Sequence, residues 1–526
     1  MNPTPTEFIF HIISRGVQPE IQIHNINSPS WVQEFGVSWR STNQTITAAK
    51  GGETLHLKLR NATGDDREIE WNPKSNLVKL CRTELWSRPF YFSLQEGELL
   101  LSDSLRLILS ILPKQPEIDH QALDTYLALE FFPAPLTPFR DIFKVGVEES
   151  CQLDLSTQTK KWIPGPLPKR QPANFDESVE EVHGALCDAI DKHQKRCPDE
   201  LVLMCSGGLD STILAHCMHG QGRAVFLAYI NSWKDETQRA HQTAEYANLS
   251  LMETRLPVFD TERFYQYAGF LDEPLGGTCG YAMRHLCSVV PQGSWIVTGH
   301  GTGTLSLMNF KHRDLGKSLD AGPLETLEDR FSQRVCYLDR AIRQRLLPLN
   351  PEALNPDPIN RMLERELPYQ EDKLKALHAL IRRQLCVTEE TSQLWAIYNA
   401  FGHTPVMPFF EHDVRKRMDR LPENILRDEN YSRRFLEKIA NRHCPGYQPP
   451  QRQLGYGLPL GLADYPNDEN MRETVDSLSN GPFNQAGLMW LLQSAKKTSG
   501  VEKFFWLRRL WSAILLHAWL DQYAGT

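Results

Sequence analysis

The sequence lacks any pair of cysteines in the C-x-x-C spacing, although it contains 11 cysteines. These cysteines are scattered between Cys81 and Cys444, and their number is odd. Such a pattern excludes the paired disulfide framework that small secreted domains use. We therefore expect reduced thiols in a cytoplasmic protein.

The chain also lacks the marks of secretion and of membrane insertion. Its first residues, MNPTPTEFIF, have no basic start and no long apolar stretch, so they do not form a signal peptide. The most apolar stretch, residues 504–520, is interrupted by Arg508, Arg509 and His517 and is too short to span a bilayer. Apolar residues recur in it at helical spacing, at Leu507, Leu510, Ile514 and Leu515. We expect a packed C-terminal helix there and no membrane partner.

An excess of basic charge is missing as well. Lysine and arginine number 57 against 65 aspartates and glutamates, which gives a formal net charge of −8. This balance argues against a general nucleic-acid-binding surface. With 41% hydrophobic and 23% charged residues the composition is globular, and 526 residues exceed the size of one ordinary core. We therefore expect two domains and no nucleic-acid partner.

The first part of the chain, up to about residue 165, is rich in patterns typical of strands. Residues 69–81 and 89–103 alternate apolar and polar side chains, and Glu96 and Gly97 mark a turn between two runs. A proline-rich stretch follows at residues 162–175 and cannot continue a helix. It is predicted to link two domains.

Beyond this linker, helical and strand patterns alternate. Helices are predicted at 178–194, 211–220 and 235–249, and strands at 201–205, 224–230 and 294–299. Such alternation indicates an α/β fold with a doubly wound parallel sheet. Residues 320–526 are mostly helical in pattern, so a helical C-terminal part is expected to complete this domain.

The loop after the first of these strands carries the strongest chemical signal. Residues 206–211 read SGGLDS and open a helix, where free amides and the helix dipole favour an anion. Gly207 and Gly208 allow close approach of the backbone to phosphate, and the hydroxyls of Ser206 and Ser211 add donors. The loop has no G-x-x-x-x-G-K-[ST] pattern, so it is not a Walker-type loop.

Asp210 narrows the interpretation of this loop. A carboxylate next to phosphate is repelled unless a divalent cation bridges the two groups. The loop therefore predicts a Mg²⁺-bound nucleotide, with Asp210 as the metal ligand. The alternative is an ordinary helix start, in which Asp210 and Ser211 are first-turn residues and the glycines form a turn.

The SGGLDS string resembles the pyrophosphate loop of the asparagine-synthetase-like enzymes, and LDEP at residues 271–274 resembles a second motif of that family. Weaker similarity covers residues 82–109, 123–146, 234–240, 408–412, 421–440 and 452–460. The resemblance implies cleavage of ATP between its α and β phosphates, adenylation of a carboxylate and its transfer to an amine. It also implies a glutaminase-like αββα domain at residues 1–165 and an ATP-pyrophosphatase synthetase domain at residues 176–526.

The resemblance assigns residues to the nucleotide. Those expected to bind ATP are Ser206, Gly207, Gly208, Leu209, Asp210 and Ser211, with Gly299 and Gly301 of a later loop. In the N-terminal domain the family's catalytic cysteine follows Met1, whereas this sequence has Asn2. An amide side chain cannot replace a thiolate nucleophile, so we expect a degenerate, non-catalytic domain and a nitrogen donor other than glutamine.

The later loop departs from asparagine synthetases. Residues 299–301 read GHG, which is similar to the lasso-peptide cyclases, the branch that closes a macrolactam on a ribosomal peptide. His300 is predicted either to deprotonate the attacking amine, with a pKa near 7, or only to bind phosphate or the loop backbone. The family's second metal-binding aspartate falls at Gly303. Either Asp272 and Glu273 replace it, unless they form a solvated pair, or Asp210 and the phosphates hold the metal.

The last departure concerns a cation. The family's late loop usually carries a lysine where this chain has Gln453, next to Arg452. A positive charge is needed there against the leaving pyrophosphate or AMP. Arg452 is the predicted substitute, although a shifted register is an equal alternative.

These features together predict an ATP- and Mg²⁺-dependent macrolactam synthetase of the lasso-peptide type. Asp210, His300 and Arg452 are its expected catalytic residues. Its substrate is a ribosomal core peptide, and a leader peptidase that exposes the amine is an implied partner. One alternative is an amide synthetase related to the β-lactam synthetases, acting on a small metabolite. Another is an inactive scaffold that binds peptide or nucleotide.

Overall fold

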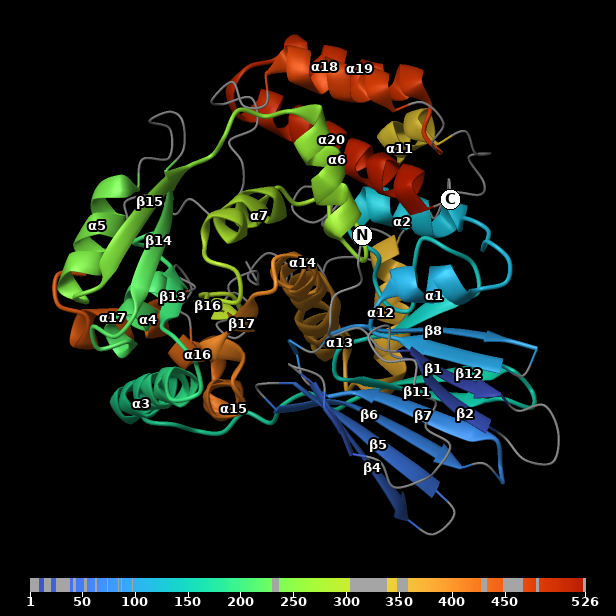
Figure 1. The fold of residues 1–526 in the computed structure, drawn as a ribbon, viewed down its shortest axis with the longest axis horizontal. Helices are drawn as coiled ribbons and strands as arrows, with labels where there is room; N and C mark the ends of the chain where they lie inside the picture. Colours follow the sequence, from blue (N-terminus) through green and yellow to red (C-terminus); the bar gives the residue numbers. More distant parts are fainter. Residues whose placement is uncertain are drawn as a thin grey trace.

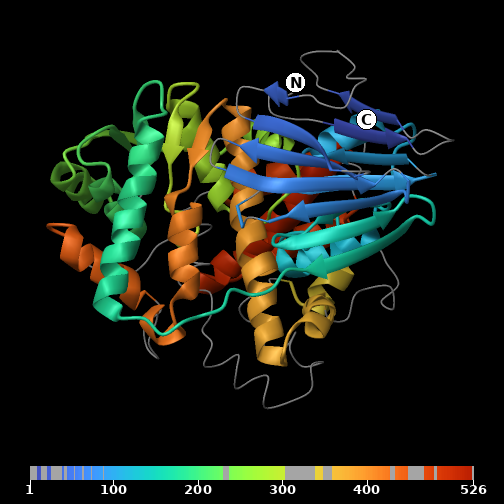
Figure 2. The ribbon, with the colours of Figure 1, turned by 90° about the horizontal axis from the view of Figure 1, so that it is seen from below.

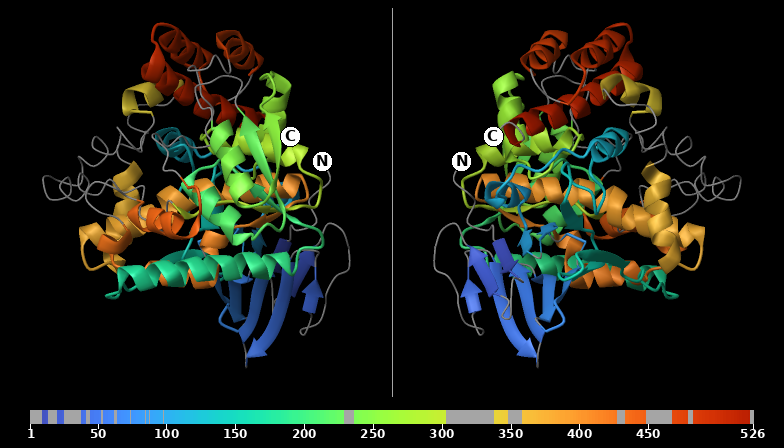
Figure 3. Two further views of the ribbon diagram at one scale, coloured as in Figure 1. Left: turned by 90° about the vertical axis from the view of Figure 1, so that its left-hand side faces the viewer. Right: turned by 90° about the vertical axis from the view of Figure 1, so that its right-hand side faces the viewer.

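A computed structural model places most of the chain. It describes residues 9–13, 20–24, 38–40, 44–51, 54–61, 64–72, 74–83, 85–86, 88–96, 98–228, 236–302, 338–347, 358–426, 433–447, 467–478 and 482–523. Antiparallel sheets lie at the bottom of the molecule and the C-terminal helices at the opposite end (Figures 1 and 3).

The N-terminal region contains two antiparallel sheets. One has the order β10-β8-β9-β1-β2 and the other the order β12-β11-β7-β6-β5-β4-β3. Their strands are β1 (Ile9–Ile13), β2 (Glu20–His24), β3 (Ser38–Arg40), β4 (Gln44–Gly51), β5 (Thr54–Asn61), β6 (Gly64–Asn72), β7 (Leu77–Arg82), β8 (Phe90–Gln95), β9 (Glu98–Ser102), β10 (Ile142–Val145), β11 (Glu149–Asp154) and β12 (Thr159–Pro164). The strands predicted within residues 69–81 and 89–103 are confirmed.

Successive side chains of β8 face opposite sides of the five-stranded sheet, and both of these sides are buried. Phe90 and Phe92 point into an apolar core with Trp71 and Leu80 of the other sheet, whereas Tyr91 packs in the larger core with the helices. Successive side chains of a strand face opposite sides, so one strand serves both layers. The turn to β9 passes through Glu96 at φ +50°, as the predicted turn requires.

The helices of this region are α1 (Leu105–Ile111) and α2 (His120–Leu129). Helix α1 contacts β8 and β9, so it covers the five-stranded sheet. The predicted αββα arrangement needs a second helical layer on the other sheet. No other helix occurs in the described part of residues 1–165. The two sheets and one helical layer are therefore present, and the glutaminase-like fold stays a prediction.

The second region is built on a five-stranded sheet of order β15-β14-β13-β16-β17, in which every pairing is parallel. Its strands are β13 (Leu201–Met204), β14 (Arg223–Ala228), β15 (Ser250–Arg255), β16 (Trp295–Val297) and β17 (Thr404–Val406). The chain adds β14 and β15 on one side of β13 and then crosses to β16 on the other side. Such a reversal is where open parallel sheets bind ligands, and the predicted doubly wound sheet is confirmed.

Helices surround this sheet and continue to the C-terminus. Those that contact its strands include α4 (Leu209–Cys217), α5 (Thr237–Tyr246), α7 (Cys279–Val289) and α14 (Val387–Ala400), while α3 (Phe175–Gln194) and α17 (Arg434–His443) pack on α4. The others are α6 (Thr261–Phe270), α11 (Arg340–Leu346), α12 (Pro358–Glu366), α13 (Lys373–Leu380), α15 (His412–Arg420), α16 (Glu423–Leu426), α18 (Asp468–Ser477), α19 (Gln485–Lys496) and α20 (Gly500–Tyr523), with short turns η4 (Leu367–Tyr369), η5 (Ile381–Cys386) and η6 (Pro408–Phe410). Helices α12–α14 lie between the antiparallel and parallel sheets (Figures 1 and 2).

The predicted C-terminal helix is confirmed as α20. Its residues Leu507, Leu510, Ile514 and Leu515 are fully buried, so the helical spacing read from the sequence does face the core. Among the described residues, no helix has both the length and the apolar character that a membrane crossing requires.

Buried ion pairs join the N-terminal region to the helices that follow it. Acidic groups of the N-terminal region face arginines contributed from far along the chain. These pairs are Asp124–Arg343, Glu130–Arg508, Glu148–Arg382 and Glu149–Arg365. Of the predicted linker at residues 162–175, residues 165–174 form no helix or strand, whereas residues 162–164 belong to β12 and Phe175 begins α3. The two regions therefore meet through paired charges as well as through a continuous apolar core.

Candidate functional site

Two loops meet at the carboxyl ends of neighbouring strands. Residues 206–211 follow β13, and residues 299–302 follow β16; we call them together the strand-end site. A Cβ atom placed on Gly299 would lie only 2.8 Å from Cβ of Asp210. The two loops therefore touch, and glycine at position 299 is what allows the contact. This arrangement confirms the expectation that both predicted loops face one site.

The first loop has a backbone that only glycine adopts readily. Gly207 has φ +67°, and a Cβ there would come within 2.5 Å of the backbone carbonyl carbon of Arg239. Gly208 directly precedes α4, and its amide donates to Oγ of Ser206 at 3.3 Å. Ser211 Oγ donates to the carbonyl oxygen of Gly208 at 3.1 Å. The turn predicted for residues 206–211 is therefore tight, and hydrogen bonds between its own residues stabilise it.

The start of α4 is left open for a bound group. No side chain of the described residues caps this helix end, although capping is the usual role of the hydroxyls and carboxylates found there. Leu209 is buried in the core, so it offers only its backbone amide. The uncapped amides and the helix dipole favour an anion. This geometry supports the nucleotide interpretation over an ordinary capped helix start.

Asp210 is the charged group of the strand-end site. Its Oδ1 atom is buried and has no hydrogen-bond partner among the described residues, while Oδ2 lies 3.5 Å from Nη1 of Arg433. Burial raises the pKa of Asp210, and the Arg433 charge and a hydrogen bond from Thr302 act against this shift. A carboxylate with one buried, unpartnered oxygen fits a metal ion.

Arg433 is a residue that the sequence analysis missed. It directly precedes α17 and its side chain is 15% exposed, so its charge is held close to Asp210. A signal was present, since Arg433 and Arg434 stand together in the family-like stretch 421–440. The predicted cation, Arg452, lies outside the described residues, as do Gln453 and Gly303. Arg433 is thus a cation that the described structure places beside the loop.

His300 lies in the second loop, where the sequence placed it. Its Nδ1 atom shares a short hydrogen bond with the hydroxyl of Thr298. Burial lowers the pKa of His300 to about 4, in contrast to the predicted value near 7. The sequence could not show this burial. The imidazole is therefore neutral at physiological pH, in the form that can accept a proton, but it is a weaker base than expected.

The segment 408–412 supports the second loop. Gly301 has φ +102°, and a Cβ on it would lie 2.9 Å from the ring of Phe410. Next to that ring, Oε1 of Glu411 pairs with Nε2 of His193 in α3 at 2.8 Å. Phe410 therefore packs against the loop that carries His300, and Glu411 joins the same segment to α3.

Asp272 and Glu273 have partners in the N-terminal region. Ser104 donates to Oδ1 of Asp272 at 2.8 Å, with Arg106 at 3.7 Å, and Lys144 forms a direct ion pair with Glu273. The Lys144 and Glu273 side chains are only 2% and 6% exposed, so the expectation of a solvated pair is wrong. These partners are different from those of Asp210. The LDEP stretch is a contact between regions of the chain.

Comparisons with known proteins identify the family to which the chain belongs. A family-wide sequence profile described as asparagine synthase matches residues 181–521. A Methanocaldococcus jannaschii protein provisionally described as glutamine-hydrolyzing asparagine synthetase 2 is 27% identical over 43% of this chain and 47% of its own length. This chain therefore spans about half of that relative. Glutamine-hydrolyzing asparagine synthetase 1 of Bacillus subtilis is 19% identical over 74% of this chain and 67% of its own.

One of the solved structures found by comparison has low similarity to this chain. It is the glutamine phosphoribosylpyrophosphate amidotransferase of B. subtilis complexed with ADP and GMP, with 7% identity over 58% of this chain and 71% of that chain. The TM-score is 0.17, which is too low to carry an argument about either region.

Proposed function

Because this chain belongs to the asparagine synthase family, we propose that it is an ATP-dependent amide ligase. In the proposed reaction a carboxylate oxygen attacks the α phosphorus of ATP and pyrophosphate leaves. An amine then attacks the activated carbonyl carbon, AMP leaves, and one proton is lost from the amine. The observation that carries the proposal is Asp210, with a buried, unpartnered oxygen at an uncapped helix start between two glycine-containing loops.

The residues of the first loop fit the triphosphate of ATP. The hydroxyls of Ser206 and Ser211 and the amides that open α4 are donors for phosphate oxygens, and Gly207 leaves the backbone accessible. Asp210 Oδ1 would hold Mg²⁺, since it is the buried oxygen that lacks a hydrogen bond. Bound Mg²⁺ would neutralise charge on the leaving pyrophosphate.

Arg433 is proposed to balance charge at the same place. Its guanidinium lies 3.5 Å from Asp210, so it already offsets the carboxylate. When phosphate and metal occupy the loop, a guanidinium at this place would also offset the charge of the phosphate oxygens. We therefore assign to Arg433 the electrostatic role that the sequence suggested for Arg452.

His300 is proposed as the group that takes the proton from the amine. For this role Nδ1–H must donate to Oγ1 of Thr298, which leaves the lone pair on Nε2 for the substrate. A pKa of about 4 makes the free imidazole a weak base. Nearby phosphate charge would raise that pKa, because an anion stabilises the imidazolium. The base is thus expected to strengthen once the anionic substrate is bound.

We further propose that the substrate is a ribosomal peptide closed into a macrolactam. The support is the GHG triplet at Gly299, His300 and Gly301, which resembles the lasso-peptide cyclases. The activated group would be a side-chain carboxylate, and the amine would be the N-terminus of the same peptide. A leader peptidase that exposes this amine would be a partner.

The test is a reaction with the matching peptide. The purified chain is incubated with ATP, Mg²⁺ and the core peptide encoded beside its gene, with a free N-terminal amine. We expect AMP and pyrophosphate release and a peptide product lighter by one water. AMP release only with a small acid and amine would favour an amide synthetase of small metabolites. No AMP release with any acid would contradict the ligase assignment and support an inactive scaffold.

A further inference from the structure

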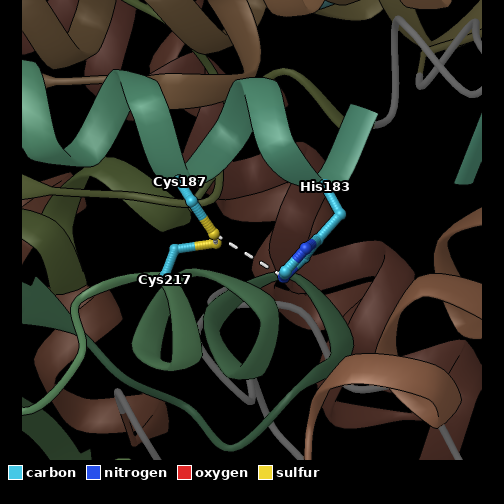
Figure 4. Close-up of side chains that lie close together, drawn as sticks. All are labelled: His183, Cys187 and Cys217. Atoms are coloured by element: carbon cyan, nitrogen blue, oxygen red, sulfur yellow. Dashed lines mark hydrogen bonds between the residues drawn. The ribbon is translucent and has the colours of Figure 1, made fainter. Parts of the chain in front are cut away.

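A cluster of soft ligands lies away from the strand-end site, at the far end of α4. His183 and Cys187 stand one turn apart on α3, and Cys217 is the last residue of α4. The three side chains converge in the space between these helices (Figure 4). One potential ligand atom from each lies within 4.8 Å of the others. The proposed reaction does not use them.

We propose that His183, Cys187 and Cys217 bind a thiophilic divalent metal ion, Zn²⁺, which fastens the end of α4 to α3. Two cysteine sulfurs and one imidazole nitrogen are a ligand set that proteins use for zinc. The fourth position would be taken by water, because three protein ligands converge in the described structure. The site lies at the opposite end of α4 from Asp210, so its effect would be on the position of this helix.

The nitrogen–sulfur distance agrees with this ligand set, whereas the sulfur–sulfur distance is too short for it. Zinc–sulfur and zinc–nitrogen bonds of about 2.3 and 2.05 Å at a tetrahedral angle separate sulfur from nitrogen by about 3.6 Å. Nε2 of His183 lies 3.6 Å from Sγ of Cys187. The sulfurs of Cys187 and Cys217 are 2.7 Å apart and must separate to about 3.8 Å. Small rotations about χ1 of the two cysteines supply this movement.

The surroundings hold the imidazole and leave a path for the metal. The ring of His443 stacks on His183 with centroids 3.8 Å apart and an interplanar angle of 5°. This contact fixes the ring plane of His183, as neighbouring groups do around metal ligands. Cys217 is buried, whereas His183 and Cys187 are partly exposed, so an ion can enter from their side.

A disulfide between the two cysteines is the competing interpretation. It would use both sulfurs but would leave the converging nitrogen of His183 without a role. The spacing of His183 and Cys187, four residues apart on one helix face, is what brings the third ligand to the pair. The convergence of this third ligand is the observation that supports a metal, while the 2.7 Å between the sulfurs makes a disulfide the outcome that the experiment must exclude.

The site would brace the elements that carry the strand-end site. Helix α4 begins in the loop of Asp210 and ends at Cys217, and α17 begins next to Arg433 and ends at His443. The aspartate–arginine pair thus lies at one end of these two helices and the cluster at the other. Loss of the metal is expected to lower the melting temperature by a few degrees.

The experiment measures zinc in the full chain, purified without a metal-affinity tag and dialysed against buffered micromolar Zn²⁺. We expect about one zinc per chain by mass spectrometry, and Co²⁺ in its place should give thiolate charge-transfer absorption. Cys187→Ser, Cys217→Ser and His183→Ala should each lose most of the metal. Cys444→Ser and His216→Ala, neighbours outside the ligand set, are the matched controls and should keep it.

The contradicting results are equally clear. Absence of bound zinc, or equal loss in the control variants, would overturn the proposal. A Cys187–Cys217 disulfide found by alkylation under non-reducing conditions in the zinc-treated protein would overturn it in favour of a redox pair. If Cys217→Ser does not fold, the partly exposed Cys187→Ser decides the matter, with circular dichroism as the check of folding. The result is independent of the ligase assignment, because no turnover is measured.

Discussion

Two acidic motifs that look alike in the sequence have different surroundings in the structure. Asp210 lies between two loops at the ends of parallel strands, with one oxygen unpartnered and Arg433 3.5 Å from the other. Asp272 and Glu273 lie against the N-terminal region, where Ser104 and Lys144 hold them. Both motifs are buried, and burial raises the pKa of all three carboxyl groups.

The difference between the motifs lies in what compensates each charge. Lys144 neutralises Glu273 by direct contact with Oε2, although Oε1 of Glu273, like Oδ1 of Asp210, has no hydrogen-bond partner among the described residues. Asp210 sits at an uncapped helix start, so a ligand can complete its surroundings. A motif match alone therefore does not separate a carboxylate that joins two regions from one that binds a ligand.

The largest effect is expected on the strand-end side of this comparison, at His300. If its imidazole takes the proton from the amine, His300→Ala should slow amide formation by about 10²–10⁴-fold. Carboxylate activation should be spared, because the proton transfer comes after it. ATP–pyrophosphate exchange and product formation are measured on the same preparation. Equal losses in both rates would remove His300 from the role of base and leave it as a phosphate-binding residue.

The contact between the LDEP stretch and the N-terminal region is tested by Lys144→Met, which removes the cation that pairs with Glu273. This change leaves Glu273 buried without its cation and should lower the free energy of unfolding by about 3–5 kcal/mol. The double variant Lys144→Met, Glu273→Gln removes both charges and should recover much of that loss. Chemical denaturation followed by tryptophan fluorescence measures both. An unchanged stability of the single variant would mean that the pair does not join the two regions.

The smallest effect is a pH dependence from His300. Its folded pKa of about 4 lies below the ordinary value of 6.5, so the unfolded chain binds the proton first as the pH falls. Stability from this group is complete above pH 6.5 and should decrease by about 2–3 kcal/mol towards pH 4. His300→Gln should show a shallower decrease over this window. Parallel stability curves for the two proteins would place the imidazole in an exposed setting instead.

Much of the fold followed from local patterns. The parallel sheet, the hairpin of β8 and β9 and helix α20 all carry periodic apolar residues, which report burial directly. Strand β17 was missed because it has three residues with a proline in the middle. Pairing with β16 stabilises this strand, and the two strands are far apart in the sequence, so no local pattern reports the contact.

The candidate site was predictable only in part. The loop of Asp210 is one continuous string, so its position after a strand could be read from the sequence. Arg433 reaches that loop from more than 200 residues away, and the pKa of His300 depends on burial. The cluster of His183, Cys187 and Cys217 joins two helices and forms no continuous motif. Such non-local features need the fold before they can be seen.

We propose that Asp210 takes part in activation of the substrate and that the LDEP carboxylates join two regions of the chain. The direct test is ATP–pyrophosphate exchange by Asp210→Asn beside the matched variants Asp272→Asn and Glu273→Gln, each compared at equal amounts of folded protein. We predict about a 100-fold loss for Asp210→Asn, since about 3 kcal/mol of metal-mediated stabilisation is removed. The two LDEP variants should exchange within a few-fold of the unchanged protein. Near-normal exchange by Asp210→Asn, or an equal loss in an LDEP variant, would contradict the account.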